Sequence, residues 1–172
     1  MRKIVVDTFR RGDILLWGET YPIKEKLKEL GYSWNPVSRN WVKESEDLDK
    51  EVEKLKKIED VEVELSEAAT LAPKLCKMTK SDFSILNRKD GKVGEIVIYP
   101  EDNNEESVKE AVEDAKRIYR ECKVHVSVEA YSKEKGTYRP YDSVFDEEMG
   151  EEMEVKPIKA VSYTHLTLPT KA

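Results

Sequence analysis

Apolar residues in the first 65 positions recur with spacings that predict a small α+β module. Two runs rich in β-branched and aromatic residues are separated by Arg10-Arg11-Gly12, a sequence typical of a hairpin turn. Apolar residues at every third or fourth position predict helices after Pro22 and after Ser45. The expected strands are residues 3–9, 13–17, 40–43 and 61–65. The predicted order of elements is therefore ββαβαβ, in a module that covers residues 1–65.

The second half of the chain predicts a smaller unit of similar design. Asp90-Gly91, a strong turn signal, joins two apolar runs into a hairpin. The longest amphipathic stretch follows, and Asn103, with a glutamate three residues later, suits the capping box at its start. Valines that alternate with polar residues at 124–129 predict one more strand. We expect a ββαβ unit at residues 82–131.

Two further segments delimit these units. Residues 66–81 contain Pro73, which disfavours a long helix, so a short helix or a linker is expected at the boundary between the two domains. Periodicity ends after Tyr131, and residues 140–156 carry seven acidic side chains and one lysine. Residues 132–160 are therefore predicted to form an acidic, flexible segment.

The last residues of the chain do not resemble natural protein sequence. Residues 161–170 read Val-Ser-Tyr-Thr-His-Leu-Thr-Leu-Pro-Thr, which resembles the translation of a transposon-end sequencing adapter. We therefore expect residues 161–172 to be an artefact and exclude them from the fold, as one would a cloning scar. His165 lies in this segment and is therefore not a candidate site residue, which leaves His125 as the remaining histidine.

Composition places the chain among soluble globular proteins. Charged residues make up 38% of its 172 residues and the mean hydropathy is −0.70. Apolar runs are too short for a membrane span or a signal peptide, so a cytoplasmic protein is expected. Cys76 and Cys122 lie far apart and outside any Cys-x-x-Cys pattern. This favours free thiols over a zinc site or a disulfide framework, and no metal ion or cofactor is expected.

The most informative segment is residues 18–43. A lysine-bearing helix ends there in Leu-Gly, and Trp34-Asn35-Pro36 then leads to Arg39 and to a second tryptophan, Trp41, in a strand. This outline resembles small accessory modules attached to DNA primases, helicases and nucleases of plasmids and phages. It also resembles the HARP domain of annealing helicases, although Asn35 stands where that turn more often has an acidic residue. The resemblance covers residues 11–60 and implies a DNA-binding accessory role in replication or repair.

Charge is distributed unevenly along the chain, which agrees with a nucleic-acid partner. Residues 1–43 contain nine basic and five acidic residues, a net charge of +4, whereas the whole chain carries −6. Basic side chains near the first helix could follow phosphates while aromatic rings stack on bases. The residues expected to bind single-stranded or junction DNA are Arg10, Arg11, Tyr21, Lys24, Lys28, Tyr32, Arg39 and Lys43. Trp17, Trp34 and Trp41 are expected to form the aromatic core of the module, because aromatic rings supply the largest buried areas.

Three alternatives remain open at this stage. Lys24 and Lys28 lie beside glutamates and also suit a merely solvated helix face. Residues 82–156 could instead form a protein-interaction or regulatory surface for a basic partner such as a helicase, primase or polymerase subunit. A small enzyme is the third, but it requires carboxylates to converge on His125 on folding, because the sequence has no catalytic motif. The leading hypothesis is a non-catalytic nucleic-acid-binding accessory protein.

Overall fold

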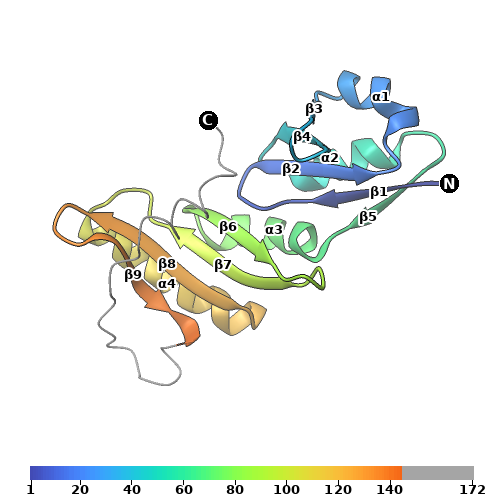
Figure 1. The fold of residues 1–172 in the computed structure, drawn as a ribbon. Coiled ribbons are helices and arrows are strands. Elements are labelled where there is room, and N and C mark those ends of the chain that lie inside the picture. The colour runs from blue at the N-terminus through green and yellow to red at the C-terminus, as the bar shows by residue number, and fades with distance from the viewer. Residues whose placement is uncertain (145–172) are drawn as a thin grey trace. The chain divides into compact units, whose positions relative to one another are not determined.

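The computed structural model describes residues 1–144, which form an α+β protein of two compact units. Unit 1 comprises Met1–Lys74 and unit 2 begins at Leu75, and each is described by itself (Figure 1). The expected α+β class is thus confirmed. The expectations for residues 145–160 and 161–172 concern parts of the chain outside the described range.

Unit 1 is built on a five-stranded sheet. Its elements are β1 (Arg2–Asp7), β2 (Asp13–Gly18), the 3-10 helix η1 (Tyr21–Ile23), α1 (Lys24–Glu29), β3 (Ser33–Asn35), β4 (Asn40–Glu44), α2 (Leu48–Lys56) and β5 (Val61–Leu65). The strand order is β3-β4-β2-β1-β5, with β5 parallel to β1 and the other neighbours antiparallel. The hairpin predicted through residues 10–12 joins β1 to β2.

The core of unit 1 lies on one side of this sheet. Side chains alternate between the two faces of a strand, so every second residue can face the helices. Ile4, Val6 and Leu16 are buried on that side, and Leu27 of α1 and Leu55 of α2 are buried as well. Burial of such residues supplies most of the stability of a small sheet and helix layer.

The structure adds one short strand that the sequence analysis did not predict, β3. The turn that joins it to β4 is closed by Asn35, whose side-chain oxygen accepts hydrogen bonds from the backbone N–H groups of Val37 and Ser38 at 3.0 and 3.2 Å. Arg39 then adopts a left-handed conformation with φ of 59°. Unit 1 is therefore ββαββαβ rather than ββαβαβ.

The segment between the two sheets is a helix, α3 (Glu67–Met78). Ser66 precedes it and accepts a hydrogen bond from the backbone N–H of Ala69 at 3.0 Å. Pro73 lies inside the helix, where its ring nitrogen cannot donate the usual backbone hydrogen bond. The boundary between the units falls inside α3, between Lys74 and Leu75. Of the two structures expected for residues 66–81, the helix is the one observed.

Unit 2 is a four-stranded sheet backed by one long helix. Its elements are β6 (Asp82–Asn87), β7 (Val93–Tyr99), α4 (Glu105–Cys122), β8 (His125–Ser132) and β9 (Gly136–Asp142). The strand order is β6-β7-β8-β9, in which β7 and β8 are parallel and the other neighbours antiparallel. A parallel pair needs a crossover connection, which α4 provides. In Figure 1, α4 lies behind β8 and β9.

The long helix α4 packs through the apolar stripe that its sequence predicts. Ala111, Ala115 and Ile118 are fully buried. The helix begins one residue later than predicted, because the side chain of Asn104 accepts the capping hydrogen bond from the backbone N–H of Ser107 at 2.8 Å. One face of the unit 2 sheet is therefore apolar and covered by a helix.

The predicted flexible segment at 132–160 is wrong for its first part, because residues 136–142 form β9 along β8. The pairing contains a bulge: Val128 lies opposite Tyr141, but Ala130 lies opposite Tyr138. Two positions of β9 therefore stand against one of β8, which breaks the alternation on which the prediction of strands depends. Unit 2 is thus ββαββ rather than ββαβ.

Within residues 1–144, each helix is too short or too polar to cross a lipid bilayer.

Candidate functional site

Unit 1 presents two exposed aromatic rings around one buried tryptophan. Trp41 is 5% exposed, and its indole N–H donates a hydrogen bond to the hydroxyl of Thr20 at 3.1 Å. Tyr21 follows Thr20 and is 74% exposed. Trp34 meets Trp41 edge to face, with ring centroids 5.6 Å apart, and is 46% exposed. Trp41 thus packs directly against Trp34 and is hydrogen-bonded to the residue that precedes Tyr21.

Cations accompany both exposed rings. The ammonium of Lys24 lies 4.3 Å from the centre of the Tyr21 ring, a favourable cation–π distance. Arg39 follows Trp34 in the β3–β4 turn, is exposed, and makes no ion pair within the described part of the chain. We call Tyr21, Lys24, Trp34 and Arg39 the aromatic corner. It combines exposed rings with positive charge, as surfaces that bind single-stranded nucleic acid do.

Helix α1 adds further positive charge close to Tyr21 in the sequence. Lys28 is paired with Glu25 at 3.7 Å, yet its side chain remains 60% exposed. Lys26 and Glu29 form a similar pair at 3.9 Å. Exposed pairs of this kind contribute little free energy, so the lysines are free to exchange a glutamate for a phosphate.

Four of the predicted nucleic-acid-binding residues are instead engaged inside unit 1. The side chain of Arg10 is 6% exposed and lies 3.6 Å from the carboxylate of Asp13. Arg11 lies 3.6 Å from Glu46. Both arginines therefore hold the β1–β2 turn and its surroundings together rather than facing solvent. The other two engaged residues are Tyr32 and Lys43.

Tyr32 and Lys43 converge on a buried carboxylate, Glu51 of α2. The hydroxyl of Tyr32 donates to Glu51 at 3.3 Å, and the ammonium of Lys43 lies 2.9 Å from the same oxygen. Lys43 also donates to the carbonyl of Leu30 at 2.6 Å. Burial, followed by the charge of Glu51 and its hydrogen bond, raises the pKa of Tyr32. At 3% exposure Tyr32 has no ring face to offer a base.

The expected tryptophan core is correct for one residue of three. Trp41 is buried, whereas Trp17 and Trp34 expose 47% and 46% of their surface. Trp34 belongs to a three-residue edge strand, which leaves its ring partly exposed to solvent. Trp17 lies opposite Val5 in the pairing of β1 with β2, on the face of the sheet away from the helices. The prediction that Trp17 and Trp34 form the core is therefore wrong.

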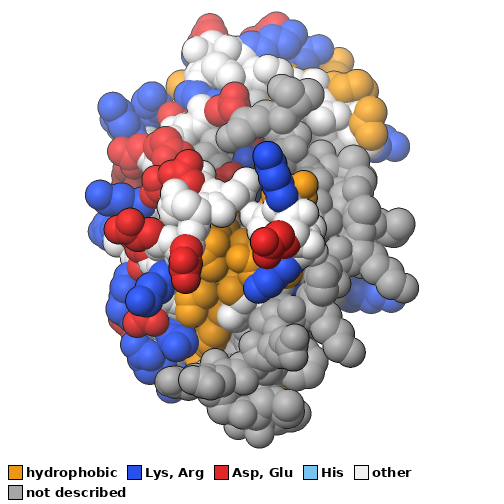
Figure 2. Space-filling view, turned by 90° about the vertical axis from the view of Figure 1, so that its left-hand side faces the viewer, with side chains coloured by type: hydrophobic (Ala, Val, Ile, Leu, Met, Phe, Trp, Pro, Cys, Tyr) orange, Lys and Arg blue, Asp and Glu red, His pale blue; other side chains and the backbone are white. Residues whose placement is uncertain are grey.

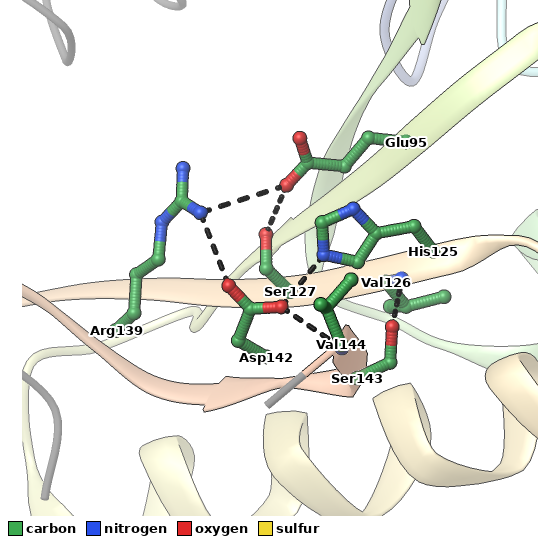
Figure 3. A network of polar contacts seen from close by, with 8 residues as sticks. All are labelled: Glu95, His125, Val126, Ser127, Arg139, Asp142, Ser143 and Val144. Carbon is green, nitrogen blue, oxygen red and sulfur yellow. Dashed lines mark hydrogen bonds and ion pairs between the residues drawn. The ribbon is translucent and has the colours of Figure 1, made fainter. Parts of the chain in front are cut away.

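Unit 2 contains a network of polar side chains that the sequence patterns did not predict. Figure 3 shows Glu95 of β7, His125 and Ser127 of β8, and Arg139 and Asp142 of β9 on the side of the sheet away from the helix. The strand pairing explains the convergence, because Glu95 lies opposite His125 and Ser127 lies opposite Asp142. Three neighbouring strands thus contribute to one polar cluster.

His125 and Asp142 form one of the two shortest contacts of this network. The Nε2 atom of His125 lies 2.6 Å from an oxygen of Asp142, which also accepts a hydrogen bond from the backbone N–H of Val144 at 3.1 Å. The hydrogen bond to Asp142 raises the pKa of His125, with help from the charge of Glu95 and against the effect of burial. Burial alone would raise the pKa of Asp142, but the hydrogen bond and charge of His125 outweigh it and lower that pKa.

The remaining members surround this pair. Arg139 lies 3.4 Å from the other oxygen of Asp142 and 3.9 Å from Glu95. The hydroxyl of Ser127 donates to Glu95 at 2.6 Å. Strict alternation would place residues 139 and 142 on opposite faces, so it is the β9 bulge that brings Arg139 to Asp142.

Glu129 of β8 is the exception in this network. It is 2% exposed, and neither of its buried carboxylate oxygens has a hydrogen-bond partner within the described part of the chain. Burial raises the pKa of Glu129 to about 7; Arg139 acts to lower it and Glu95 acts to raise it. An unpaired buried carboxylate is costly when ionised, so this residue is set to hold a proton near neutrality.

The polar network therefore brings carboxylates to His125, as the enzyme interpretation required. If its proton lies on Nε2, the neutral imidazole keeps Nδ1 as an acceptor, the state of a general base. However, Ser127 donates its hydroxyl to Glu95 rather than to the imidazole. Within residues 1–144, the network therefore holds no serine–histidine pair of the kind that activates a nucleophile.

Sequence patterns could not reveal this network. Its members come from three strands, and one of those strands, β9, is hidden by its bulge. Alternation did place His125 on the polar face of its strand, which is the one available signal.

Charges of both signs are interspersed on the surface shown in Figure 2. Lysine and arginine side chains lie among aspartates and glutamates, beside an apolar strip. On this face of the described residues, neither sign covers a broad area. Attraction of a charged partner to such a surface depends on local clusters, such as a few cations beside exposed rings.

Comparisons with protein-family models, with curated proteins and with solved structures give no match for this chain. Among residues 1–144, His, Cys, Asp and Glu side chains form no group of three or more that could hold a metal ion.

Proposed function

We propose that the protein is a non-catalytic accessory protein that binds single-stranded or junction DNA through the aromatic corner of unit 1. The observation that carries this proposal is the exposure of Tyr21 and Trp34, at 74% and 46%, each with a cation close by in space or sequence. Exposed rings beside cations are the combination with which proteins bind single-stranded nucleic acid. The resemblance of residues 11–60 to accessory modules of replication proteins points to the same partner.

Base stacking is the first source of affinity in this proposal. Every base has a flat face, so an exposed ring can stack on it without regard to sequence, for about 1–3 kcal/mol per base. Trp34 packs against the buried Trp41, and Tyr21 follows Thr20, whose hydroxyl is hydrogen-bonded to Trp41. Each of the two exposed rings can stack on one base of a single strand.

Phosphate contacts are the second source. Lys24, Lys28 and Arg39 are the predicted residues whose charges remain available at the surface. Three phosphate contacts to a single strand correspond to a slope of about −2 for log K against log salt concentration. The proposed site is thus smaller than the predicted one, since Arg10, Arg11, Tyr32 and Lys43 act inside the unit.

Fluorescence anisotropy of a labelled oligothymidylate of about 12 nucleotides tests the proposal. Tyr21→Ala and Trp34→Ala should each raise Kd about fivefold to a hundredfold, because each removes one stacking ring. Lys24→Ala combined with Arg39→Ala should weaken binding and reduce the salt slope by about 1.4, because two phosphate contacts are lost.

A matched control is available in unit 2. Lys89 and Lys92 are both exposed, so Lys89→Ala with Lys92→Ala removes the same charge from another surface. This control should leave Kd and the salt slope unchanged. Equal losses in the two double variants, or full affinity in Tyr21→Ala and Trp34→Ala, would show that the aromatic corner is not the site.

A further inference from the structure

The face of the unit 1 sheet opposite the one that packs on α1 and α2 carries an apolar centre. Alternation along the strands puts Val5 of β1, Leu15 and Trp17 of β2, and Val42 of β4 on this face. In the pairing, Val5 lies opposite Trp17 and Leu15 lies opposite Val42. These four side chains are therefore neighbours. Trp17 exposes 47% of its surface, Leu15 and Val42 are half-buried, and Val5 is buried. We call them, with their surroundings, the open face.

Carboxylates surround the apolar centre. Glu62 and Glu64 of β5 lie opposite Lys3 and Val5, so both share the open face, and both are exposed. Glu44 of β4 belongs to the same face and is exposed as well. Lys3 is paired with Glu64 at 3.1 Å, whereas Glu44 and Glu62 form no ion pair within the described residues. The rim is therefore negatively charged.

The apolar centre and the acidic rim together favour one kind of binding partner. An exposed tryptophan with aliphatic neighbours is the composition of an interface hot spot, and a charged rim chooses partners of the opposite sign. Nucleic acid is disfavoured here, because its phosphates would face the glutamates. A partner segment with one apolar side and flanking lysines or arginines can pack its apolar side on the centre and pair its cations with the glutamates of the rim.

We propose that the open face of unit 1 is a docking surface for a basic, amphipathic segment of a partner protein. It is separate from the aromatic corner: Trp34 lies opposite the buried Trp41 on the helix side of the sheet, whereas Trp17 lies on the other side. The two surfaces have opposite charge. The inference therefore does not depend on the nucleic-acid proposal.

A synthetic amphipathic peptide of leucine and lysine, about 14 residues or four helical turns long, probes this surface on the full chain. Its matched partner has glutamate in place of each lysine. Isothermal titration should show binding of the lysine peptide and at least about tenfold weaker binding of the glutamate peptide.

Two variants locate the peptide on the chain. Trp17→Ala should raise Kd about 30-fold, because a tryptophan at the centre of an interface is typically a hot spot. Glu62→Lys combined with Glu64→Lys should raise Kd about tenfold or more by reversing the charge of the rim. Trp34→Ala is the control, since it removes an equally exposed indole from the other side of the sheet. Circular dichroism of each variant verifies that the fold is retained.

The outcomes are distinct. Losses in Trp17→Ala and in the charge-reversal variant, with Trp34→Ala unaffected, support the docking surface. Failure of the lysine peptide to bind, equal binding of both peptides, or equal loss in Trp34→Ala overturns it. Displacement of the peptide by oligothymidylate would assign the face to nucleic acid, and a dimer that dissociates in Trp17→Ala would assign it to a second copy of the chain. Either result also overturns the proposal.

Discussion

Among residues 1–144, each unit buries one glutamate, and the surroundings of the two glutamates are opposite in kind. Glu51 in unit 1 is 4% exposed and receives Tyr32, Lys43 and, at 3.7 Å on its second oxygen, Lys54. Glu129 in unit 2 is 2% exposed, and neither of its oxygens has a hydrogen-bond partner among the described residues. Burial alone therefore does not define the role of a carboxylate in this protein, since its partners decide whether it is held as a charge or as an acid.

The two units also differ in where their interacting polar groups lie. In unit 1 the buried polar residues are paired, and the unpaired cations and rings lie at the surface, where a partner can reach them. In unit 2 the polar residues converge on the face of the sheet away from α4, where protonation changes the balance of their charges. We therefore expect unit 1 to respond to ligands and unit 2 to respond to pH.

The largest expected effect comes from removing the partnered glutamate. Glu51→Ala leaves Lys43 and Tyr32 without their acceptor in the core of unit 1 and should reduce its free energy of unfolding by about 3–5 kcal/mol. All three tryptophans, Trp17, Trp34 and Trp41, belong to unit 1, so tryptophan fluorescence during urea unfolding reports on this unit. A loss well below 1 kcal/mol would mean that the pairing around Glu51 is not structural.

The next effect concerns pH and unit 2. The pKa of Glu129 rises from 4.5 to about 7 on folding, so at intermediate pH the native form holds a proton that the unfolded chain has released. Its contribution, about 3 kcal/mol for such a difference, is complete below about pH 4.5 and is lost as pH rises through 7. Hydrogen exchange of the β8 amides, measured from pH 5 to 8 and corrected for the intrinsic rate, should show this loss.

His125 and Asp142 define the rest of this pH profile. The raised pKa of His125 gives stability that is present below about pH 6.5 and is lost as pH rises through its folded value. The lowered pKa of Asp142 gives stability that is lost as pH falls through its folded value, below 3.8. Unit 2 should therefore be most stable in mildly acidic solution. Glu129→Gln should flatten the decline above pH 5, and an unchanged decline in this variant would contradict the assignment to Glu129.

A smaller effect is expected for the buried hydroxyl of the polar network. Ser127→Ala removes the 2.6 Å hydrogen bond to Glu95 and should destabilise unit 2 by about 1 kcal/mol. Tryptophan fluorescence should not change, because the substitution lies in unit 2, whereas the exchange of the β8 amides should accelerate. Tryptophan unfolding curves that shift as much as the exchange does would show that the units do not behave separately.

The smallest effect is expected at the surface of α1. Lys28→Ala breaks a pair with Glu25 that is exposed on both sides and should change the unfolding free energy by less than about 0.5 kcal/mol. The same variant should lower affinity for oligothymidylate and reduce the salt slope by about 0.7. Lys28→Ala is thus expected to weaken binding without affecting stability, whereas Glu51→Ala lowers stability. A loss of more than about 1 kcal/mol of unfolding free energy in Lys28→Ala would contradict this difference.

Much of the fold could be predicted because its elements are regular. The stripe of α4 and the alternation in β5 and β8 repeat long enough to reveal a helix or a strand. β3 has three residues, too few to show a period. β9 contains a bulge at Arg139 and Pro140, where two residues oppose one, so its alternation is broken at the centre.

The candidate sites were less predictable, because exposure and pairing depend on contacts distant in sequence. Lys43 is basic and lies near the tryptophan turn, yet Glu51 on the next helix binds it inside the unit. The sequence pattern does not distinguish Trp34 from Trp41. In the structure Trp34 lies on the edge strand β3 and is partly exposed, whereas Trp41 is buried. The contacts of His125 with β9 arise from strand pairing that no local pattern specifies.

Mapping of amide chemical-shift changes on the full chain, with oligothymidylate added in steps at low salt, tests the central claim most directly, because one experiment observes both units. The proposed function predicts that shifts cluster at Tyr21, Lys24, Trp34 and Arg39 and fade as salt is raised. Shifts centred on Glu95, His125 and Asp142, or no shifts at all, would contradict it.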